Sequence, residues 1–223
     1  MISRKKMLRI MLLICLGAGM ILACLFIYLG AAGRVRAEDL ADLDLKDGDI
    51  IFQVSSSSQS LAIQAATGSK YSHCGLIFQQ NGQFYVFEAI NRVSRTPLAD
   101  WINRGVRGHF LVMRLKDRDK LLGSDRLRSM AKTGRGLAGK PYDLRFLWSD
   151  DKMYCSELVW KIYERGAGLI LVKPKTFQDY NLDSELVREA VKQRFGAEVP
   201  TDEKVVAPSD LLDSPLLERV AGN

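Results

Sequence analysis

The chain contains very little histidine. His73 and His109 are its only two histidines, so any chemistry that needs an imidazole has two candidates. Cysteine is also scarce: four occur, two of them in the apolar run 10–33, which leaves Cys74 and Cys155 in the rest of the chain. These two histidines and two cysteines lack the spacing of a zinc site, so we expect no metal and no cofactor.

Other absences narrow the class of protein. No stripe of basic residues with interleaved aromatics is present, and the net charge of +6 comes partly from basic residues around the N-terminal apolar run, so we expect no nucleic-acid binding. There is no internal repeat, and the only low-complexity stretch is Ser55–Ser58. With 47% hydrophobic and 26% charged residues, the 223-residue chain has the composition of one globular domain with an appendage.

The appendage is the N-terminal segment. Residues 10–33 carry no charge over about 24 positions, which is long enough to cross a bilayer as a helix. Four basic residues precede this segment, whereas the two arginines after it are followed at once by Glu38 and Asp39. The positive-inside rule then places the N-terminus in the cytoplasm. We therefore expect a single-pass membrane segment, residues 1–37, and a domain, residues 38–223, on the periplasmic or extracytoplasmic side of the cytoplasmic membrane.

Two other interpretations of this segment stay open. Residues 35–37 (Val-Arg-Ala) loosely fit a signal-peptide cleavage site, although the apolar core is longer than the roughly 7–15 residues of an ordinary signal. Cys24, preceded by Ile-Leu-Ala, resembles a lipoprotein site, but another apolar stretch follows it. An uncleaved anchor fits the length best, and all three alternatives place the domain outside the cytoplasm.

Secondary-structure signals in the domain favour strands first and helices later. Strands are expected where β-branched and aromatic residues are dense, and helices where apolar residues recur at three- and four-residue spacing. The expected strands are residues 50–54, 72–79, 83–90 and 109–115, and the expected helices run from Ser57 or Ser58 to Gly68, from Asp125, and from Cys155. The C-terminal tail is expected to pack back on the sheet. Early strands with helices on one side indicate the α+β class.

The hairpin between the second and third expected strands fixes a register. The Asn-Gly pair at 81–82 predicts a two-residue type I′ turn, in which Gln80 pairs with Gln83. Counting back along both strands places Gly75 opposite Glu88. Glycine at that position would leave the space beneath the Glu88 carboxylate unoccupied.

The same register brings a histidine and a carboxylate together. His73 lies two residues before Gly75, so it shares a sheet face with Glu88 as a diagonal neighbour. A carboxylate on an imidazole fixes its tautomer and stabilises the imidazolium, as in a nucleophile–base–orienter triad. Cys74 points to the opposite face and cannot partner His73 without a register slip that would separate His73 from Glu88.

Cys155 is therefore the candidate nucleophile. It opens the expected helix 155–163, where backbone N–H groups and the helix dipole stabilise a thiolate and would also bind an oxyanion. Its proximity to His73 is an inference from chemistry. A buried, inert thiol and a Cys74–Cys155 disulfide are the competing interpretations, and the opposite sheet faces disfavour the disulfide.

Other residues have weaker claims to function. Tyr142 either lines the pocket, helps to bind an oxyanion, or packs in the core. His109 begins a strand and is expected to be structural. Asp49 and Asp143 fit turns and no more.

Five segments of the domain together resemble a known family. They are Asp-Gly-Asp-Ile-Ile-Phe at 47–52, Ser-His-Cys-Gly-Leu-Ile-Phe at 72–78, Val-Phe-Glu-Ala at 86–89, Pro-Tyr-Asp at 141–143 and Tyr-Cys-Ser-Glu-Leu-Val-Trp at 154–160. This set is similar to the YiiX/YebB-like group of the circularly permuted papain-like superfamily, which is related to NlpC-type cell-wall peptidases and to lecithin:retinol acyltransferase. The resemblance extends from Leu45 to Leu212.

The resemblance implies a permuted papain-like α+β fold, with an antiparallel sheet and packed helices. By the order histidine, acidic residue, cysteine, it implies Cys155 as nucleophile, His73 as base and Glu88 as third member. The long apolar segment at the N-terminus departs from the short export signals usual in the group.

We thus expect a cysteine hydrolase that cleaves an amide or ester acyl bond of a cell-envelope peptide or lipid through an acyl-enzyme. An acyltransferase of the same fold and a catalytically silent envelope-binding module are the alternatives. The sequence gives no substrate and no oligomeric state. Residues 173–204 read as a loop followed by an amphipathic helix that would cover the site as a lid.

Overall fold

The computed structural model describes residues 34–196 and 199–223. The predicted membrane segment, residues 10–33, lies outside the described residues. Within the two described ranges, no helix combines the length and the apolar character needed to cross a bilayer.

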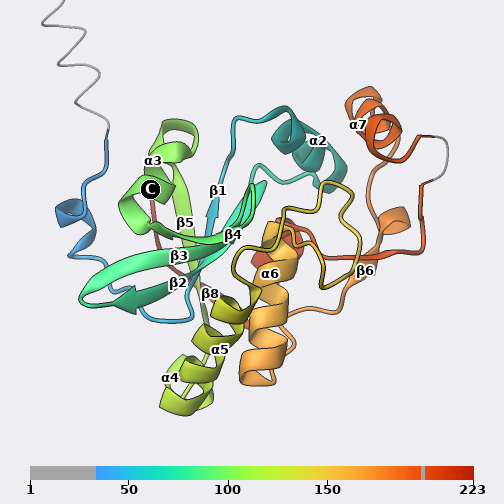
Figure 1. Cartoon of the computed structure of the whole chain (residues 1–223). Helices are drawn as coiled ribbons and strands as arrows, with labels where there is room; N and C mark the ends of the chain where they lie inside the picture. Colours follow the sequence, from blue (N-terminus) through green and yellow to red (C-terminus); the bar gives the residue numbers. More distant parts are fainter. Residues whose placement is uncertain (1–33, 197–198) are drawn as a thin grey trace, which may run out of the picture.

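A six-stranded antiparallel sheet forms the centre of the domain, in the order β4-β3-β2-β1-β5-β8 (Figure 1). Its strands are β1 (Ile50–Gln53), β2 (His73–Gln80), β3 (Gln83–Ala89), β4 (Val93–Pro97), β5 (Phe110–Leu115) and β8 (Leu217–Gly222). A separate two-stranded sheet pairs β6 (Lys175–Thr176) with β7 (Lys204–Val205). The C-terminal tail does return to the large sheet, because β8 pairs with β5.

Helices cover both faces of the sheet, so the expectation of helices on one side was wrong. Figure 1 shows α3 on one side of the β2–β3 ribbon and α5 and α6 on the other. The helices are α2 (Ser58–Thr67), α3 (Leu98–Arg104), α4 (Arg118–Leu121), α5 (Ser124–Leu137), α6 (Cys155–Ile162), α7 (Glu185–Phe195) and α8 (Pro208–Leu212). Short 3-10 turns lie at Glu38–Leu40, Val106–Gly108 and Phe177–Asp179, and a π-helical turn, Tyr163–Ala167, continues α6.

Alternation along the strands produces two cores. On β1, Ile50 and Phe52 face the core that α5 and α6 cover, whereas Ile51 faces the core that holds Trp101 of α3. Both cores exclude water from large side chains, each of which contributes about 1.5–3 kcal/mol when fully buried. This arrangement holds α6 against the middle of the sheet.

The predicted hairpin register is confirmed. Gln80 pairs with Gln83 and Leu76 with Phe87. Asn81 and Gly82 have φ angles of 51° and 77°, the left-handed pair that a type I′ turn requires. The face that each residue of β2 and β3 occupies therefore follows the prediction.

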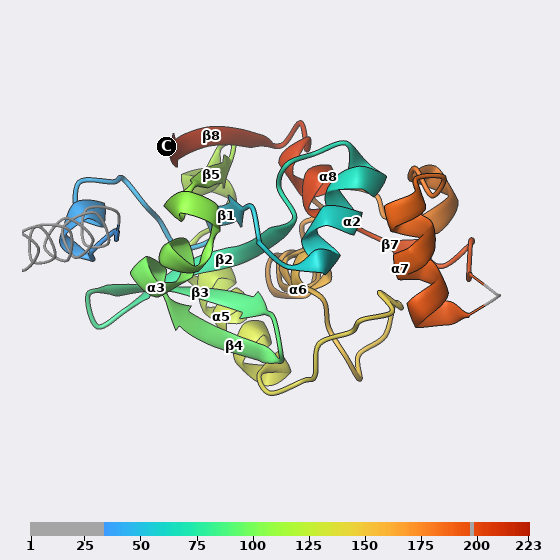
Figure 2. The same ribbon diagram turned by 90° about the horizontal axis from the view of Figure 1, so that it is seen from above.

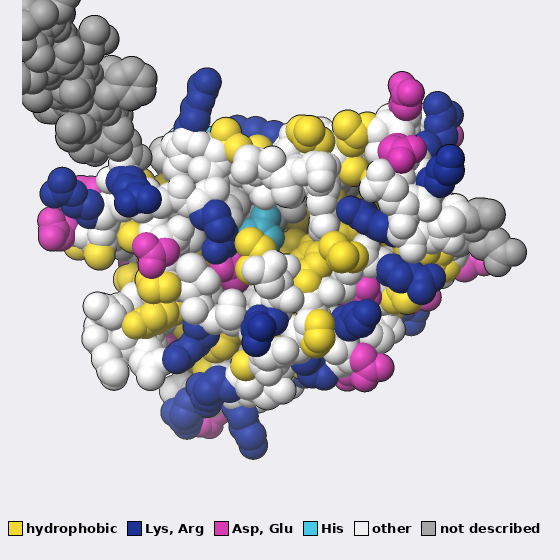
Figure 3. Space-filling view, turned by 45° about the horizontal axis from the view of Figure 1, so that its top comes forward, with side chains coloured by type: hydrophobic (Ala, Val, Ile, Leu, Met, Phe, Trp, Pro, Cys, Tyr) yellow, Lys and Arg dark blue, Asp and Glu magenta, His cyan; other side chains and the backbone are white. Residues whose placement is uncertain are grey.

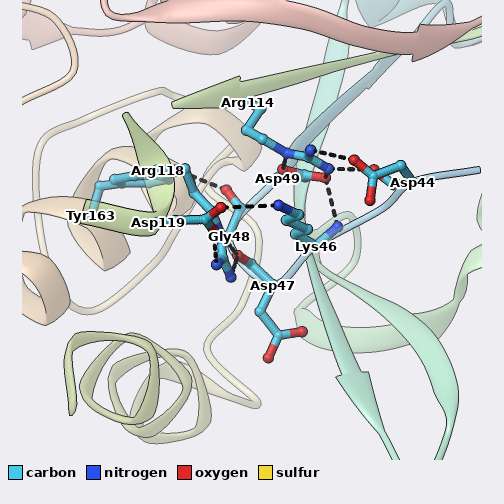
Figure 4. Close-up of polar contacts among 9 residues, drawn as sticks. All are labelled: Asp44, Lys46, Asp47, Gly48, Asp49, Arg114, Arg118, Asp119 and Tyr163. Atoms are coloured by element: carbon cyan, nitrogen blue, oxygen red, sulfur yellow. Dashed lines mark hydrogen bonds and ion pairs between the residues drawn. The ribbon is translucent and has the colours of Figure 1, made fainter. Parts of the chain in front are cut away.

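A buried ion pair closes the end of β1 that is remote from Gln53 (Figure 4). Asp49 is fully buried and accepts hydrogen bonds from Nε and Nη2 of Arg114, each 2.8 Å long, and from the backbone N–H of Lys46 at 2.8 Å. The same guanidinium donates from Nη1 to Asp44 Oδ2 at 2.9 Å. Asp49 thus joins the turn before β1 to β5, and its interpretation as a turn residue and no more was wrong.

Candidate active site

His73 and Glu88 contact each other, as the register requires. His73 is the first residue of β2, and its Nε2 lies 2.7 Å from Oε2 of Glu88 near the end of β3, with both side chains buried. Gly75 is needed between them for a different reason from the predicted one. A Cβ at Gly75 would lie 2.3 Å from Val86 Cγ1 and 2.8 Å from the Phe87 carbonyl oxygen, but 3.5 Å from Glu88 Cβ, which is an ordinary contact.

Strand β4 and helix α3 supply three neighbours that sequence reasoning missed. Thr96 donates from Oγ1 to Glu88 Oε1 at 2.5 Å, and Arg104 donates from Nη2 to Glu88 Oε2. Trp101 stacks on the His73 ring, with centroids 5.7 Å apart and an interplanar angle of 23°. A proline followed by Leu-Ala-Asp-Trp-Ile at 97–102 is a helix-start signal that could have revealed α3.

These contacts keep the Glu88 carboxylate ionised. Burial alone raises the pKa of a carboxyl group, because a charge is poorly solvated inside the protein. The hydrogen bond and charge of His73, with the hydrogen bonds from Arg104 and Thr96, outweigh burial and lower the pKa of Glu88 to about 2. An ionised carboxylate therefore faces the imidazole at neutral pH.

Cys155 begins α6, as predicted, and is almost fully buried. Because the first N–H groups of a helix have no backbone partner within it, a negative charge at the start of α6 is favoured. The hydrogen bond from the Cys74 thiol, together with the charge and hydrogen bond of His73, lowers the pKa of Cys155 well below its ordinary range despite burial. The sulfur, the imidazole and the carboxylate thus form one continuous chain of contacts.

His73 carries the complementary charge. Burial lowers the pKa of an imidazole, but the Cys155 and Glu88 side chains outweigh burial and raise the pKa of His73 to about 9. The geometry therefore favours a thiolate–imidazolium pair at neutral pH, with the carboxylate behind the imidazolium.

Cys74 lies closer to Cys155 than the sequence indicated. It points away from His73, as predicted, but it shares a core cluster with Cys155. The argument that opposite faces separate Cys74 from Cys155 was therefore wrong. His73, at the first position of β2, reaches the sulfur from the strand end, while Cys74 reaches it from the face that α6 covers. Both thiols are free.

Tyr142 also reaches this site. Its hydroxyl accepts a hydrogen bond from Nε2 of Gln59 in α2 at 2.7 Å. Burial and the negative charge of Cys155 raise the pKa of Tyr142 well above its ordinary range, so the hydroxyl keeps its proton. A protonated hydroxyl can donate a hydrogen bond, and this one is close enough to Cys155 for the charge of the sulfur to act on it. Gln59 had no signal in the sequence.

The remaining candidates lie in other clusters. His109 Nε2 is 3.0 Å from Lys70 Nζ, and its ring stacks on Tyr71 at 6.0 Å between centroids. Asp143 accepts hydrogen bonds from the backbone N–H groups of Arg145 and Leu147, which is turn chemistry. Neither residue contacts Cys155 through any hydrogen bond that the described chain contains.

An apolar pocket opens onto Cys155 between α2 and α7, which lie side by side in Figures 1 and 2. Figure 3 shows apolar side chains gathered in a hollow at the centre of one face, with Lys and Arg side chains beside it. The segment 173–204 contributes α7 to the wall of this pocket, as the predicted lid would. The lining residues are Ala62, Ile63, Ala66 and Thr67; Phe146, Tyr154, Cys155 and Ser156; Phe177, Tyr180 and Leu182; Val187, Ala190, Val191, Arg194 and Phe195; and Val205, Val206, Ala207 and Pro208.

A thiol at a helix N-terminus that follows its histidine in the chain is the arrangement of a papain-like hydrolase with permuted element order. Comparison with known families agrees with this class. Residues 44–221 match the family described as permuted papain-like amidase enzymes, YaeF/YiiX, the C92 family. The chain belongs to this family, whose members are papain-like hydrolases.

Two relatives illustrate the similarity. The chain is 42% identical over 174 residues to the protein YiiX of Escherichia coli strain K12, which covers 78% of this chain and 85% of the relative. It also matches the crystal structure of the metalloprotein YiiX from Escherichia coli O157:H7, with a TM-score of 0.76 and 42% identity over 80% of this chain and 97% of that one.

That relative is described as a metalloprotein, so the side chains that could bind a metal ion in our chain matter. Among the residues that the structure of our chain describes, no group of three or more His, Cys, Asp or Glu side chains is arranged to hold a metal ion. The carboxylate nearest the imidazole, Glu88, is already bound by Arg104 and Thr96. The side chains of residues 34–196 and 199–223 therefore do not fit a metal site.

Proposed function

We propose that the protein is a cysteine hydrolase in which Cys155, His73 and Glu88 act as nucleophile, general acid–base and orienter. The observation that carries this proposal is the 2.7 Å contact between His73 and an ionised, buried Glu88, together with the effect that His73 and Cys155 have on each other's pKa. The three groups come from β2, β3 and α6, so the fold holds them without help from loops.

The reaction follows from these roles. The Cys155 thiolate attacks the acyl carbon, and the oxyanion that forms is stabilised by N–H groups at the start of α6, with Tyr142 as an additional donor. His73 gives its proton to the leaving amine or alcohol, which departs and leaves a thioester on Cys155. His73 then takes a proton from water, the hydroxide adds to the thioester carbon, and the free acid leaves with the thiolate restored.

The pocket supports an apolar acyl group as the part of the substrate held by the enzyme. Aliphatic and aromatic side chains form most of its wall up to Cys155, and α2 and α7 supply part of them. Covering such a wall with an apolar chain lowers the free energy, because apolar surface leaves water. Its apolar side chains offer no hydrogen bonds to a peptide backbone. With residues 10–33 as a membrane segment, the domain would act on acyl bonds of cell-envelope peptides or lipids at the outer surface of the cytoplasmic membrane.

Thiol labelling tests this proposal directly. We expect iodoacetamide at pH 6.5 to label Cys155 in the full-length protein faster than an ordinary thiol, with the site mapped by mass spectrometry, because the pKa of Cys155 is lowered. His73→Ala should slow this labelling by about tenfold or more. His109→Ala is the matched control, since it removes the other histidine and should leave the rate unchanged.

Turnover gives the second measurement. Hydrolysis of p-nitrophenyl octanoate should fall by on the order of 10⁴-fold in Cys155→Ala, with an unchanged melting temperature. Ordinary thiol reactivity that His73→Ala does not alter would instead favour a catalytically silent binding module. Transfer of the octanoyl group to an added amine or alcohol in preference to water would favour an acyltransferase.

A further inference from the structure

Arg194 is a cation in the wall of an otherwise apolar pocket. It lies in the last turn of α7 and lines the same pocket as Cys155. Its guanidinium carbon lies 5.2 Å from the centroid of the Phe146 ring, a cation–π contact that fixes where the charge stands. The side chain is half-buried, so water solvates it incompletely.

No carboxylate within residues 34–196 and 199–223 forms an ion pair with Arg194. Three other arginines that pack against the domain are each matched: Arg104 by Glu88, Arg114 by Asp49 and Asp44, and Arg118 by Asp119. Burial lowers the pKa of Arg194, as expected for a cation that loses water. Leaving such a charge unpaired costs free energy that a bound anion would recover.

A second guanidinium stands at the same end of α7. Arg145 is exposed, and its guanidinium carbon lies 5.1 Å from the centroid of the Phe195 ring. Phe195 lines the pocket next to Arg194. Two cations thus lie over aromatic rings of the pocket wall, and Figure 3 shows Lys and Arg side chains beside the apolar hollow.

We propose that Arg194 binds the anionic group of an amphiphilic substrate, a phosphate or a carboxylate, whose apolar part fills the pocket between α2 and α7. The planar guanidinium can donate two parallel hydrogen bonds to either anion, and Arg145 adds positive potential at the mouth. This subsite deepens the proposed function, on which it rests, because it selects anionic amphiphiles among the acyl compounds that the pocket admits.

Equilibrium dialysis of radiolabelled octyl phosphate, octanoate and octanol against the full-length protein in neutral-lipid nanodiscs tests the subsite. We expect both anions to bind about tenfold more tightly than octanol. Arg194→Gln should remove this preference and leave octanol binding unchanged, whereas Arg194→Lys, which keeps the charge, should retain part of it. Lys192→Gln is the matched control, because it removes one exposed charge from the same helix and should keep the full preference.

Three outcomes would overturn the subsite: equal binding of octanol and the anions, an anion preference that survives Arg194→Gln, or binding of inorganic phosphate as tight as that of octyl phosphate. Circular dichroism of each variant verifies that α7 is intact. The measurement needs no turnover, so its outcome does not depend on the reactivity of Cys155. An inert Cys155 with an intact anion preference would therefore reject the triad and keep the subsite.

Discussion

A buried carboxylate lies beside an arginine at each end of strand β1, but the two carboxylates have different further partners. At the end that begins β1, Asp49 meets Arg114; at the end where Gln53 pairs with His73, Glu88 meets Arg104. Both carboxylates are fully buried. The same pair of residue types therefore serves two purposes within one sheet.

The difference lies in whether the carboxylate contacts a further titratable side chain besides its arginine. Asp49 has both oxygens bound by one guanidinium, and the remaining donors of Arg114 are taken by Asp44, so the cluster is closed (Figure 4). Glu88 contacts His73, and the pKa of His73 also responds to Cys155, which lines an apolar pocket. Breaking a buried charge cluster that is closed on itself destabilises the fold, whereas a cluster that includes a titratable group facing a pocket is a candidate functional site.

The strongest test of this difference between the two ends of β1 is to neutralise the Glu88 carboxylate. In Glu88→Gln, the imidazolium loses its counter-charge and the amide can present an N–H to the ring, so the wrong tautomer is favoured. We expect kcat/KM for p-nitrophenyl octanoate to fall on the order of 10³-fold. The measurement is steady-state hydrolysis at pH 7, with circular dichroism to confirm the fold.

Glu218→Gln provides the control for this substitution. Glu218 is also a strand glutamate, on β8, but it is exposed. Its activity should equal that of the wild type. A Glu88→Gln protein that keeps nearly full activity would mean that the two ends of β1 do not differ in the way we describe.

The corresponding change at the other end is Asp49→Asn. It leaves Arg114 with only the exposed carboxylate of Asp44, and we expect the free energy of unfolding to fall by about 3 kcal/mol. Urea denaturation measures this loss. Iodoacetamide labelling of Cys155 at pH 6.5 should stay at the wild-type rate in the folded protein, and Asp42→Asn, at an exposed position nearby, should change neither quantity.

The hairpin of β2 and β3 was the part of the fold that local sequence determined best. The Asn-Gly turn admits one register, and that register alone places His73 and Glu88 on one face. The start of α6 at Cys155 followed from apolar spacing in the same way. These are short-range features, in which the residues that decide the structure are neighbours in the chain.

Features that depend on distant partners could not be predicted. Strand β4 is Val-Ser-Arg-Thr-Pro, which has no clear alternation, and it becomes a strand because β3 offers a free edge. Arg104 therefore could not be assigned to Glu88, nor Arg114 to Asp49, because each pair joins residues from different elements. The contact between Cys74 and Cys155 was missed because the side of the sheet on which α6 packs is a tertiary choice.

The pH dependence of turnover sharpens the comparison further. Cys155 gives up its proton below its ordinary pKa, whereas the pKa of His73 rises from 6.5 to about 9. The ion pair is therefore present at neutral pH and is lost as the pH rises through 9, when His73 can no longer protonate the leaving group. We expect kcat/KM to fall by about tenfold per pH unit above that point. Asp49→Asn should give the same pH profile as the wild type, since Asp49 lies at the other end of β1 from His73.

The smallest expected effect concerns Cys74, which is the donor nearest the sulfur on the α6 side. Burial and the negative charge of Cys155 raise the pKa of Cys74, so this thiol stays protonated and donates to the thiolate. Cys74→Ala removes that donor, and the pKa of Cys155 should rise. An S–H group is a weak donor, so we expect the midpoint of pH-dependent Cys155 labelling to move up by less than about one pH unit. Cys74→Ser, which restores a hydroxyl donor, should bring the midpoint back. If Cys74→Ala leaves the midpoint where it was, His73 and not Cys74 sets the ionisation of Cys155. The cluster at the Glu88 end would then be a single chain of contacts from Arg104 through Glu88 and His73 to the sulfur.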